Sequence, residues 1–179
     1  MVLEKKLSEF LNPEEVLDQL ELKSDMTAVE FGCGSGGFTI PLAKRLDEGL
    51  VYAIDIQKEP LSALKGRIQL ENIVNVRIIR GDVEKPEGST LGPGSVDLVL
   101  IVNVLFQAAN KNAIIAEVER VLKQGGKLLI VDWKPKVSKG PEQGRVSADD
   151  VKKTAEERGL KLEEQFEAGR YHYGLIFNK

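Results

Sequence analysis

The sequence predicts an α/β fold built on a largely parallel sheet. Short apolar runs of strand length alternate with longer helical patterns along the 179 residues, as in parallel α/β proteins. The run VDLVLIV at Val96–Val102 is almost continuously apolar, which is typical of a central strand buried on both faces. Near the N-terminus an apolar run stops at four glycines, and a helical pattern follows. These glycines (Gly32, Gly34, Gly36 and Gly37) indicate a tight strand-to-helix turn.

The strands are predicted from apolar, β-branched runs bounded by Gly, Pro, Asn or Asp. Only about four residues join the last two runs, so these two are expected to form an antiparallel hairpin. In chain order the predicted strands are Thr27–Phe31, Leu50–Ile54, Val74–Ile79, Val96–Val102, Lys127–Val131, Leu162–Phe166 and Tyr171–Asn178.

The helix boundaries have local chemical reasons. Asn12 before Pro13 combines a side-chain cap with a proline in the first turn, and Ser147 caps the last helix. Glycines at 125–126 and at 159 end helices, because they permit the left-handed conformation that follows a helix. A helix therefore begins near Pro13, and further helices are predicted at 36–47, 59–70, 108–122 and 147–158.

Composition places the chain among soluble, single-domain proteins. Apolar residues make up 42% and charged residues 30%, and 25 basic against 28 acidic residues leave a net charge of −3. This balance argues against a nucleic-acid partner, which needs a basic face. The single cysteine, Cys33, excludes an internal disulfide and favours a reducing compartment. Without a signal-like or membrane-spanning apolar run, we expect one cytoplasmic domain over residues 1–179.

The glycine turn by itself fits two nucleotide fingerprints. Gly32, Gly34 and Gly37 match the G-x-G-x-x-G of dinucleotide-binding proteins. Glu30 followed by glycines at 32, 34 and 36 matches an acid-x-G-x-G-x-G pattern equally well. Asp55, at the end of the second strand, stands where an acid would bind ribose hydroxyls in either case. An anionic end of the ligand would meet the N–H groups of the helix start.

Three features favour the second fingerprint. Asp82, after the third strand, supplies a carboxylate that can accept a hydrogen bond from an adenine amino group. The chain closes with a strand hairpin and shows no separate catalytic domain. It also lacks the Tyr-x-x-x-Lys pair on which one-domain dehydrogenases commonly rely.

With these features the sequence resembles the class I S-adenosylmethionine-dependent methyltransferases. Within them it is similar to the small group that includes the ubiquinone/menaquinone-biosynthesis and arsenite methyltransferases. The resemblance implies a Rossmann-like three-layer sandwich with seven strands, in which strand seven lies antiparallel between five and six. It also implies in-line methyl transfer from S-adenosylmethionine to a small-molecule acceptor. Its carriers are VEFGCGSG (Val29–Gly36), YAIDIQ (Tyr52–Gln57), GDVEKP (Gly81–Pro86), VDLVLIVNVLFQ (Val96–Gln107), LKQGGKLLIVDWKP (Leu122–Pro135) and RYHYGLIFNK (Arg170–Lys179).

The resemblance assigns a cofactor role to the residues that match the family pattern. Glu30 would favour the cationic end of the methionine moiety, Asp55 would accept both ribose hydroxyls, and Asp82 would accept the adenine amino group. The expected cofactor-binding residues are Glu30, Gly32, Cys33, Gly34, Gly36, Asp55, Ile56, Gly81, Asp82, Val83 and Asn103.

The acceptor is expected beyond the carboxyl ends of strands four to seven, where ligands of open α/β sheets bind. His172, the sole histidine, is either a general base or a packed strand residue, and the sequence leaves both open. The catalytic candidates are His172, Asn103 and Asp132. The substrate-side candidates are Gln107, Trp133, Arg170, Tyr171 and Tyr173.

Several alternatives remain open on the sequence alone. The chain could be a non-catalytic S-adenosylmethionine-binding module or an NAD-dependent oxidoreductase. Arsenite methylation is disfavoured because Cys33 is the single cysteine, and no metal site is expected. Residues 1–25 are expected to form a helical cap, and the basic segment 134–146 is either an acceptor-side lid or a solvated loop. The acceptor and the oligomeric state are not determined.

Overall fold

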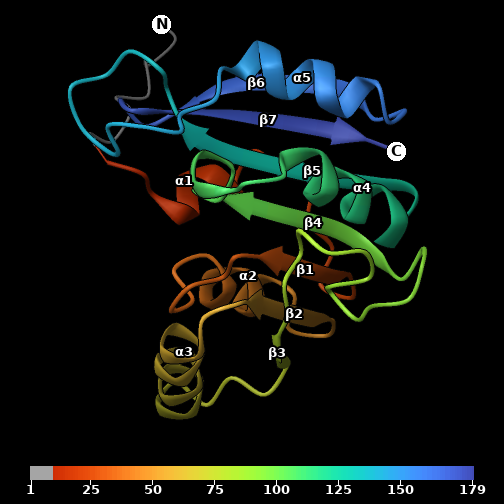
Figure 1. The fold of residues 1–179 in the computed structure, drawn as a ribbon. Helices are drawn as coiled ribbons and strands as arrows, with labels where there is room; N and C mark the ends of the chain where they lie inside the picture. Colours follow the sequence, from red (N-terminus) through yellow and green to blue (C-terminus); the bar gives the residue numbers. More distant parts are fainter. Residues whose placement is uncertain (1–9) are drawn as a thin grey trace, which may run out of the picture.

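A seven-stranded sheet forms the centre of the computed structural model, which describes residues 10–179 (Figure 1). The strand order is β3-β2-β1-β4-β5-β7-β6. The strands are β1 (Thr27–Phe31), β2 (Leu50–Asp55), β3 (Val76–Arg80), β4 (Val96–Val102), β5 (Leu122–Trp133), β6 (Lys161–Ala168) and β7 (His172–Asn178). The helices are α1 (Pro13–Leu17), α2 (Thr39–Arg45), α3 (Lys58–Leu70), α4 (Lys111–Val121) and α5 (Ala148–Glu156), with a 3-10 turn η1 (Leu105–Gln107).

The strand directions confirm the predicted fold class. Strands β1 to β5 pair in parallel, whereas β7 pairs antiparallel with β5 on one side and with β6 on the other. The opposite direction of the β7 arrow is visible beside β5 in Figure 1. The hairpin expected from the short connection between the last two strands is therefore confirmed. All the parallel strands end at one edge of the sheet.

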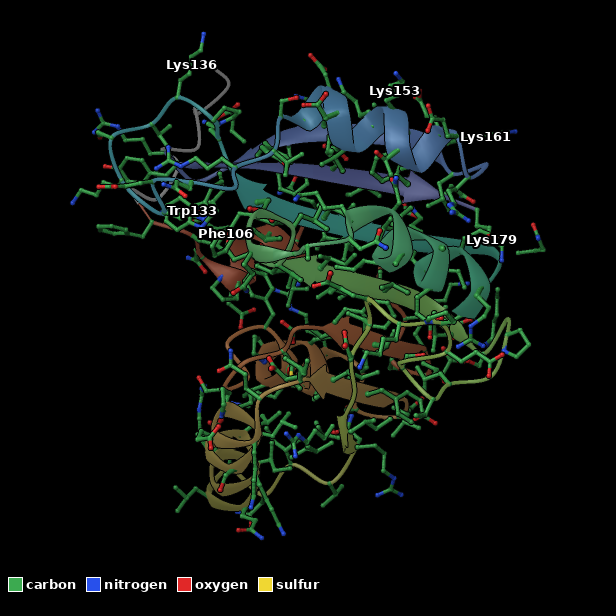
Figure 2. All side chains as sticks on the ribbon, viewed as in Figure 1. Phe106, Trp133, Lys136, Lys153, Lys161 and Lys179 are labelled. Atoms are coloured by element: carbon green, nitrogen blue, oxygen red, sulfur yellow. The ribbon has the colours of Figure 1, made fainter. Side chains whose placement is uncertain are left out.

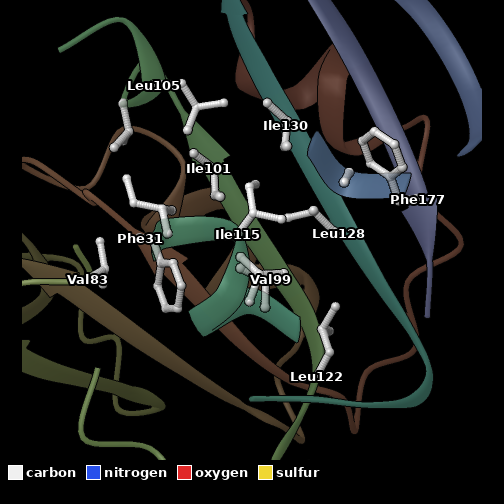
Figure 3. Packing of buried hydrophobic residues seen from close by; sticks show 14 of the residues in the cluster. Phe31, Val83, Val99, Ile101, Leu105, Ile115, Leu122, Leu128, Ile130 and Phe177 are labelled. Carbon is white, nitrogen blue, oxygen red and sulfur yellow. The ribbon is translucent and has the colours of Figure 1, made fainter. Parts of the chain in front are cut away.

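Two apolar layers hold the helices against the sheet, which gives the expected three-layer sandwich. Along β4, Val99 and Ile101 face the layer under α4 and α5, while Leu98 and Leu100 face the layer under α1, α2 and α3. All four side chains are at most 2% exposed. Figure 3 shows the first layer, in which Val99 and Ile101 lie among side chains of β1, β5, β7 and α4. This two-sided burial explains the continuous apolar run of β4.

Most predicted boundaries agree with the structure within a few residues, and the caps act as expected. The Asn12 side chain accepts a hydrogen bond from Glu14 N, and that of Ser147 accepts one from Asp150 N. The predicted helix 36–47 begins only at Thr39, because Gly36 has a φ of +89°, which no α-helical residue adopts. Of the expected N-terminal cap, α1 is present, and residues 1–9 lie outside the described part.

The predicted helix 108–122 begins too early and ends within one residue of the observed helix. A 3-10 turn, η1, precedes it, and α4 starts only at Lys111, where the Asn110 side chain accepts a hydrogen bond from Ala113 N. At the other end Leu122 already pairs with Val96 as the first residue of β5. Tertiary pairing thus ends the helix before the two glycines at 125–126.

A loop at residues 81–95 connects β3 to β4 without a helix, and a buried carboxylate holds it. Glu117 of α4 is 3% exposed and accepts hydrogen bonds from both the backbone N (3.1 Å) and the hydroxyl of Ser89. Arg120 pairs with Glu117 (2.7 Å) and donates to the Leu91 carbonyl (2.8 Å). This network fixes the loop that carries Asp82.

None of the helices within residues 10–179 is long and apolar enough to cross a membrane.

Replacement of Glu117 by Ala tests this network. The variant leaves the buried Ser89 donors without their acceptor, so we expect the free energy of unfolding to fall by about 2 kcal/mol. Chemical denaturation measures the loss. Glu156→Ala, at an exposed position of α5, is the control and should change stability by less than about 0.5 kcal/mol. Equal effects of the two variants would show that the network does not hold the loop.

Candidate active site

A cavity of about 410 Å³ opens at the carboxyl edge of β1, β2 and β4, between the turns that follow these strands. Such a cleft is the usual ligand site of an open α/β sheet. Its wall consists of Gly32, Gly34, Ile54, Asp55, Ile56, Gln57, Pro60, Gly81, Asp82, Val83, Glu84, Asn103, Val104, Gln107, Ala108 and Ile114.

The turn after β1 requires glycine at three positions. Gly32, Gly34 and Gly36 have φ values of +72°, +52° and +89°, which side chains with a Cβ rarely adopt. A Cβ on Gly32 would also lie 2.4 Å from Val104, and one on Gly36 would lie 2.4 Å from Leu64. The close approach of these neighbours leaves no room for a side chain.

The same geometry separates the two glycine fingerprints. Gly37 lacks a positive φ, and a Cβ built on it would meet nothing within 4 Å. The third glycine of a dinucleotide fingerprint serves close packing of helix on strand, and Gly37 makes no such packing. The conformationally required glycines are therefore those of the acid-x-G-x-G-x-G pattern that begins at Glu30.

Asp55 ties the glycine turn to the end of β2. Its Oδ2 accepts a hydrogen bond from Gly34 N (2.9 Å), and its Oδ1 accepts one from Gln57 N (2.9 Å). Each carboxylate oxygen has a second lone pair for a ligand donor. Ile56, next in the chain, lines the cavity with its side chain 54% exposed.

Asp82 occupies the equivalent place after β3. Its Oδ1 accepts a hydrogen bond from Glu84 N (3.1 Å), and its Oδ2 lies 3.4 Å from Lys85 Nζ. Gly81 has no space for a Cβ, because the Gly88 carbonyl oxygen lies 2.3 Å from that position. The loop therefore folds back on itself and presents Asp82 and the buried Val83 to the cavity.

Glu30 lies below the turn and does not line the cavity. It is 2% exposed and accepts a hydrogen bond from the Thr39 hydroxyl (2.5 Å). Burial raises the pKa of this carboxyl from 4.5 to about 8. Cys33 and Gly36 are buried beside it, and burial also raises the pKa of the Cys33 thiol. Glu30 can thus hold a proton at neutral pH and lose it to solvent when a cationic group binds nearby.

Asn103, directly after β4, lines the cavity and carries a buried amide oxygen. Its φ is +55°, and its backbone N donates to the Val131 carbonyl (2.9 Å). Within residues 10–179, its buried Oδ1 has no hydrogen-bond donor. A buried acceptor without a partner costs free energy, so this oxygen is suited to a ligand donor.

Asp132, near the end of β5, is fully buried and turned toward η1. Its Oδ2 accepts hydrogen bonds from Leu105 N (2.9 Å) and Phe106 N (3.4 Å), and its Oδ1 accepts one from Trp133 N (2.8 Å). Burial raises the pKa of this carboxyl from 3.8 to about 6. Asp132 does not line the cavity.

His172 lies opposite Trp133 in the β5–β7 pairing, with the two ring centroids 4.0 Å apart. It is 3% exposed, and neither ring nitrogen has a hydrogen-bond partner among the described residues. Burial lowers the pKa of His172 from 6.5 to about 4, so the ring is neutral at pH 7. A neutral imidazole offers one donor and one acceptor.

The three other residues of the β6–β7 corner make contacts of their own. Tyr173 donates its hydroxyl to the Val146 carbonyl (3.1 Å), and burial raises its pKa. Tyr171 is buried, and its ring centroid lies 6.1 Å from that of Phe10. The exposed Arg170 places its guanidinium 5.8 Å from the Tyr171 ring centre. None of the three lines the cavity.

Arg145 organises the basic loop between β5 and α5 from within. Its guanidinium donates to five backbone carbonyls of the loop, those of Lys134, Pro135, Val137, Lys139 and Pro141. A Cβ on Gly140 would lie 2.4 Å from the Trp133 indole, so the loop passes directly over that ring. Figure 2 shows Phe106 and Trp133 at this edge of the sheet and Lys136 on the outer part of the loop.

The cavity brings together nine of the predicted site residues, namely Gly32, Gly34, Asp55, Ile56, Gly81, Asp82, Val83, Asn103 and Gln107. Glu30, Cys33, Gly36, Asp132, Trp133, Arg170, Tyr171, His172 and Tyr173 lie outside its wall. Sequence reasoning missed Val104, which packs against Gly32, and Thr39, which donates to Glu30. No motif in the chain assigned a role to either residue.

Comparison with known proteins places these features in a family. The sequence model of the family described as "Methyltransferase domain" matches residues 22–170. The crystal structure of a SAM-dependent methyltransferase from Aquifex aeolicus superposes with a TM-score of 0.85 at 28% identity, covering 94% of this chain and 90% of that one.

Two curated relatives match over shorter stretches. A probable cobalt-precorrin-6B C(15)-methyltransferase (decarboxylating) from Methanocaldococcus jannaschii is 40% identical over 68 residues, 38% of this chain and 36% of that protein. A demethylmenaquinone methyltransferase from Bacillus mycoides is 28% identical over 135 residues, 74% of this chain and 55% of that protein. The matches thus span about a third and about half of these relatives' lengths.

The family match covers most of the chain and includes the glycine turn, Asp55, Asp82 and Asn103. The protein therefore belongs to the methyltransferase-domain family and has the class I S-adenosylmethionine-dependent methyltransferase fold that its sequence resembles.

Proposed function

We propose that this protein binds S-adenosylmethionine in the 410 Å³ cavity and transfers its methyl group to a small-molecule acceptor. The observation that carries the proposal is one cavity that joins three complementary features. These are the glycine turn, the Asp55 carboxylate that holds it, and the unpaired amide oxygen of Asn103.

The residues of the cavity fit the chemical parts of this cofactor. Asp55 keeps free lone pairs for two ribose hydroxyls, and Asp82 does so for the adenine amino group. Ile56 and Val83 provide apolar walls for a flat base. The Asn103 oxygen accepts from the ammonium group, and Glu30 stabilises that cation from below. When bound, the cofactor would supply an electrophilic methyl carbon on a sulfonium, from which the thioether S-adenosylhomocysteine leaves in line as the acceptor's nucleophile bonds to that carbon.

We propose that the acceptor side is formed by Asn103, Gln107 and the Trp133–His172 pair, with residues 134–146 as a lid. The loop already passes over Trp133, and Arg145 holds its shape. The chain's task in the reaction is to align the nucleophile and exclude water, and orientation is worth up to ~7–11 kcal/mol. His172 is neutral, and its ring offers one hydrogen-bond donor and one acceptor for orienting the substrate; its pKa of about 4 makes it a weak base.

The acceptor is proposed at the level of a small organic molecule. The two curated relatives are named for a precorrin and for demethylmenaquinone, which are both small molecules. The net charge of −3 disfavours a nucleic acid as the acceptor.

Methyl transfer from labelled S-adenosylmethionine to phenols, quinones, amines and carboxylic acids tests the activity. Absence of transfer in the whole panel, with the cofactor bound, would favour a binding module. The cytoplasmic location stays a prediction.

Ligand-induced thermal stabilisation tests the cofactor. S-adenosylhomocysteine should raise the melting temperature and NAD should not, because a ligand stabilises only the fold that binds it. Asp55→Ala removes both proposed ribose acceptors, so its affinity for S-adenosylhomocysteine should fall about 30-fold or more by calorimetry. The exposed Asp47→Ala is the matched control and should bind like the wild type. Stabilisation by NAD alone would overturn the proposal.

Glu30 should couple cofactor binding to proton release. Its pKa of about 8 keeps the carboxyl mostly protonated at pH 7, and a bound ammonium group favours the charged form and lowers that pKa. Calorimetry of S-adenosylhomocysteine binding in buffers of different ionisation enthalpy should detect a proton released by the wild type at pH 7. Glu30→Gln should release none and bind more weakly. Equal proton release by both proteins would exclude Glu30.

His172→Ala separates acceptor chemistry from cofactor binding. We expect its affinity for S-adenosylhomocysteine to stay within about twofold, while methyl transfer to an identified acceptor falls about 100-fold. Asn178→Ala, at the other end of β7, is the control for changes in the strand. Unchanged turnover in His172→Ala would assign this side chain to packing.

A further inference from the structure

The turn that carries Asn103 is strained. Asn103 has a φ of +55°, in the left-handed region that asparagine tolerates better than most residues but that still costs free energy. Such a conformation persists only where the surroundings impose it. Asn103 also lines the cavity, and its buried Oδ1 has no hydrogen-bond donor within residues 10–179. Contacts with neighbouring elements must therefore stabilise this turn in its left-handed conformation.

Most of the contacts that hold it come from the end of β5. The Val131 carbonyl accepts the hydrogen bond of Asn103 N (2.9 Å). One residue on, Asp132 Oδ2 accepts those of Leu105 N (2.9 Å) and Phe106 N (3.4 Å), two and three residues after Asn103. The Gln107 amide closes the turn by donating to the Asn103 carbonyl (3.2 Å). A carboxylate is the strongest available acceptor for two such N–H groups.

Asp132 is buried without a cationic partner in contact. In the part of the chain that the structure describes, no ion pair includes it. The titratable groups around it are Lys111 of α4, which favours its charged form, and Tyr173 of β7, with Asp150 of α5 beyond that ring. Burial of a carboxylate is costly, and here the backbone N–H groups offset most of the desolvation, with a smaller contribution from Lys111.

We propose that Asp132 is a positioning residue, which holds the β4–η1 turn so that the Asn103 amide oxygen faces the cofactor's ammonium group. Asp132 itself lies outside the cavity and acts through the backbone of Leu105 and Phe106. The inference rests on the proposed function, since it assumes that a cofactor occupies the cavity.

A double-mutant cycle on S-adenosylhomocysteine affinity tests the proposal. Asn103→Gly removes the amide and relieves the positive φ, and affinity should fall about tenfold. Asp132→Asn leaves one neutral side-chain oxygen for the three backbone N–H groups that the carboxylate accepts, and affinity should also fall several-fold. Because both act through one amide oxygen, the double variant should bind no more weakly than Asn103→Gly alone. Single effects that multiply in the double variant would overturn the proposal.

Two further measurements exclude a merely structural effect. Asp97→Asn, which also removes a carboxylate that accepts a backbone N–H (Thr27 N, 2.9 Å) but at the opposite edge of the sheet, should leave the affinity unchanged. The pH dependence of S-adenosylhomocysteine binding tests the role of Asp132 without a substitution at that position. As the pH falls through about 6, Asp132 takes up a proton and the wild type should bind more weakly, whereas Asn103→Gly should show no such step.

The possible outcomes distinguish a failure of this proposal from a failure of the proposed function on which it rests. A step at pH 6 that persists in Asn103→Gly contradicts positioning through Asn103, while the proposed function stands. A wild-type protein that does not bind S-adenosylhomocysteine at any pH overturns the proposed function and this inference with it.

Discussion

The parallel strands β1 to β4 leave backbone N–H groups in the turns that follow them at the active-site edge, and carboxylates accept these groups. Asp55 does so for the turns after β1 and β2, Asp82 for the turn after β3, and Asp132 for the turn after β4. Buried or half-buried N–H groups must find acceptors, and a carboxylate accepts several at once. The positions of these turns, and of the cavity between them, depend on this one constraint.

The same constraint explains which polar groups are left for a ligand. The carboxylates satisfy the backbone and thereby make the turns rigid. Asn103 Oδ1 and both nitrogens of His172 remain without partners within residues 10–179. Each such group costs free energy in the free protein, and a ligand can recover that cost on binding. Glu30 is also available to a ligand, because burial keeps its carboxyl protonated at neutral pH until a cationic group binds nearby.

Local patterns predicted the fold well because they report local physics. The apolar run of β4, the Asn12 and Ser147 caps and the short β6–β7 connection depend on neighbouring residues, and all agree with the structure. The predicted start of the fifth strand at Lys127 was wrong, because pairing of Leu122 with Val96 begins β5 earlier in the chain. In the site, the glycines and Asp55 could be predicted from spacing. The η1-directed carboxylate of Asp132 could not, since its partners are 26 and 27 residues away.

The sequence by itself determined the α/β class, the antiparallel pairing of the last two strands, and the place of the ligand turn between Val29 and Thr39. These depend on hydrophobic periodicity and on glycines whose spacing is visible in the chain. The sequence favoured one of the two overlapping glycine fingerprints, and the tertiary structure added the conformational reason, because Gly36 has a positive φ and a close neighbour, Leu64, whereas Gly37 has neither. Only the tertiary structure decided that Asp132 faces a backbone turn and that His172 is buried against Trp133. Burial and contacts between distant segments arise only when the sheet brings these strand ends to one edge.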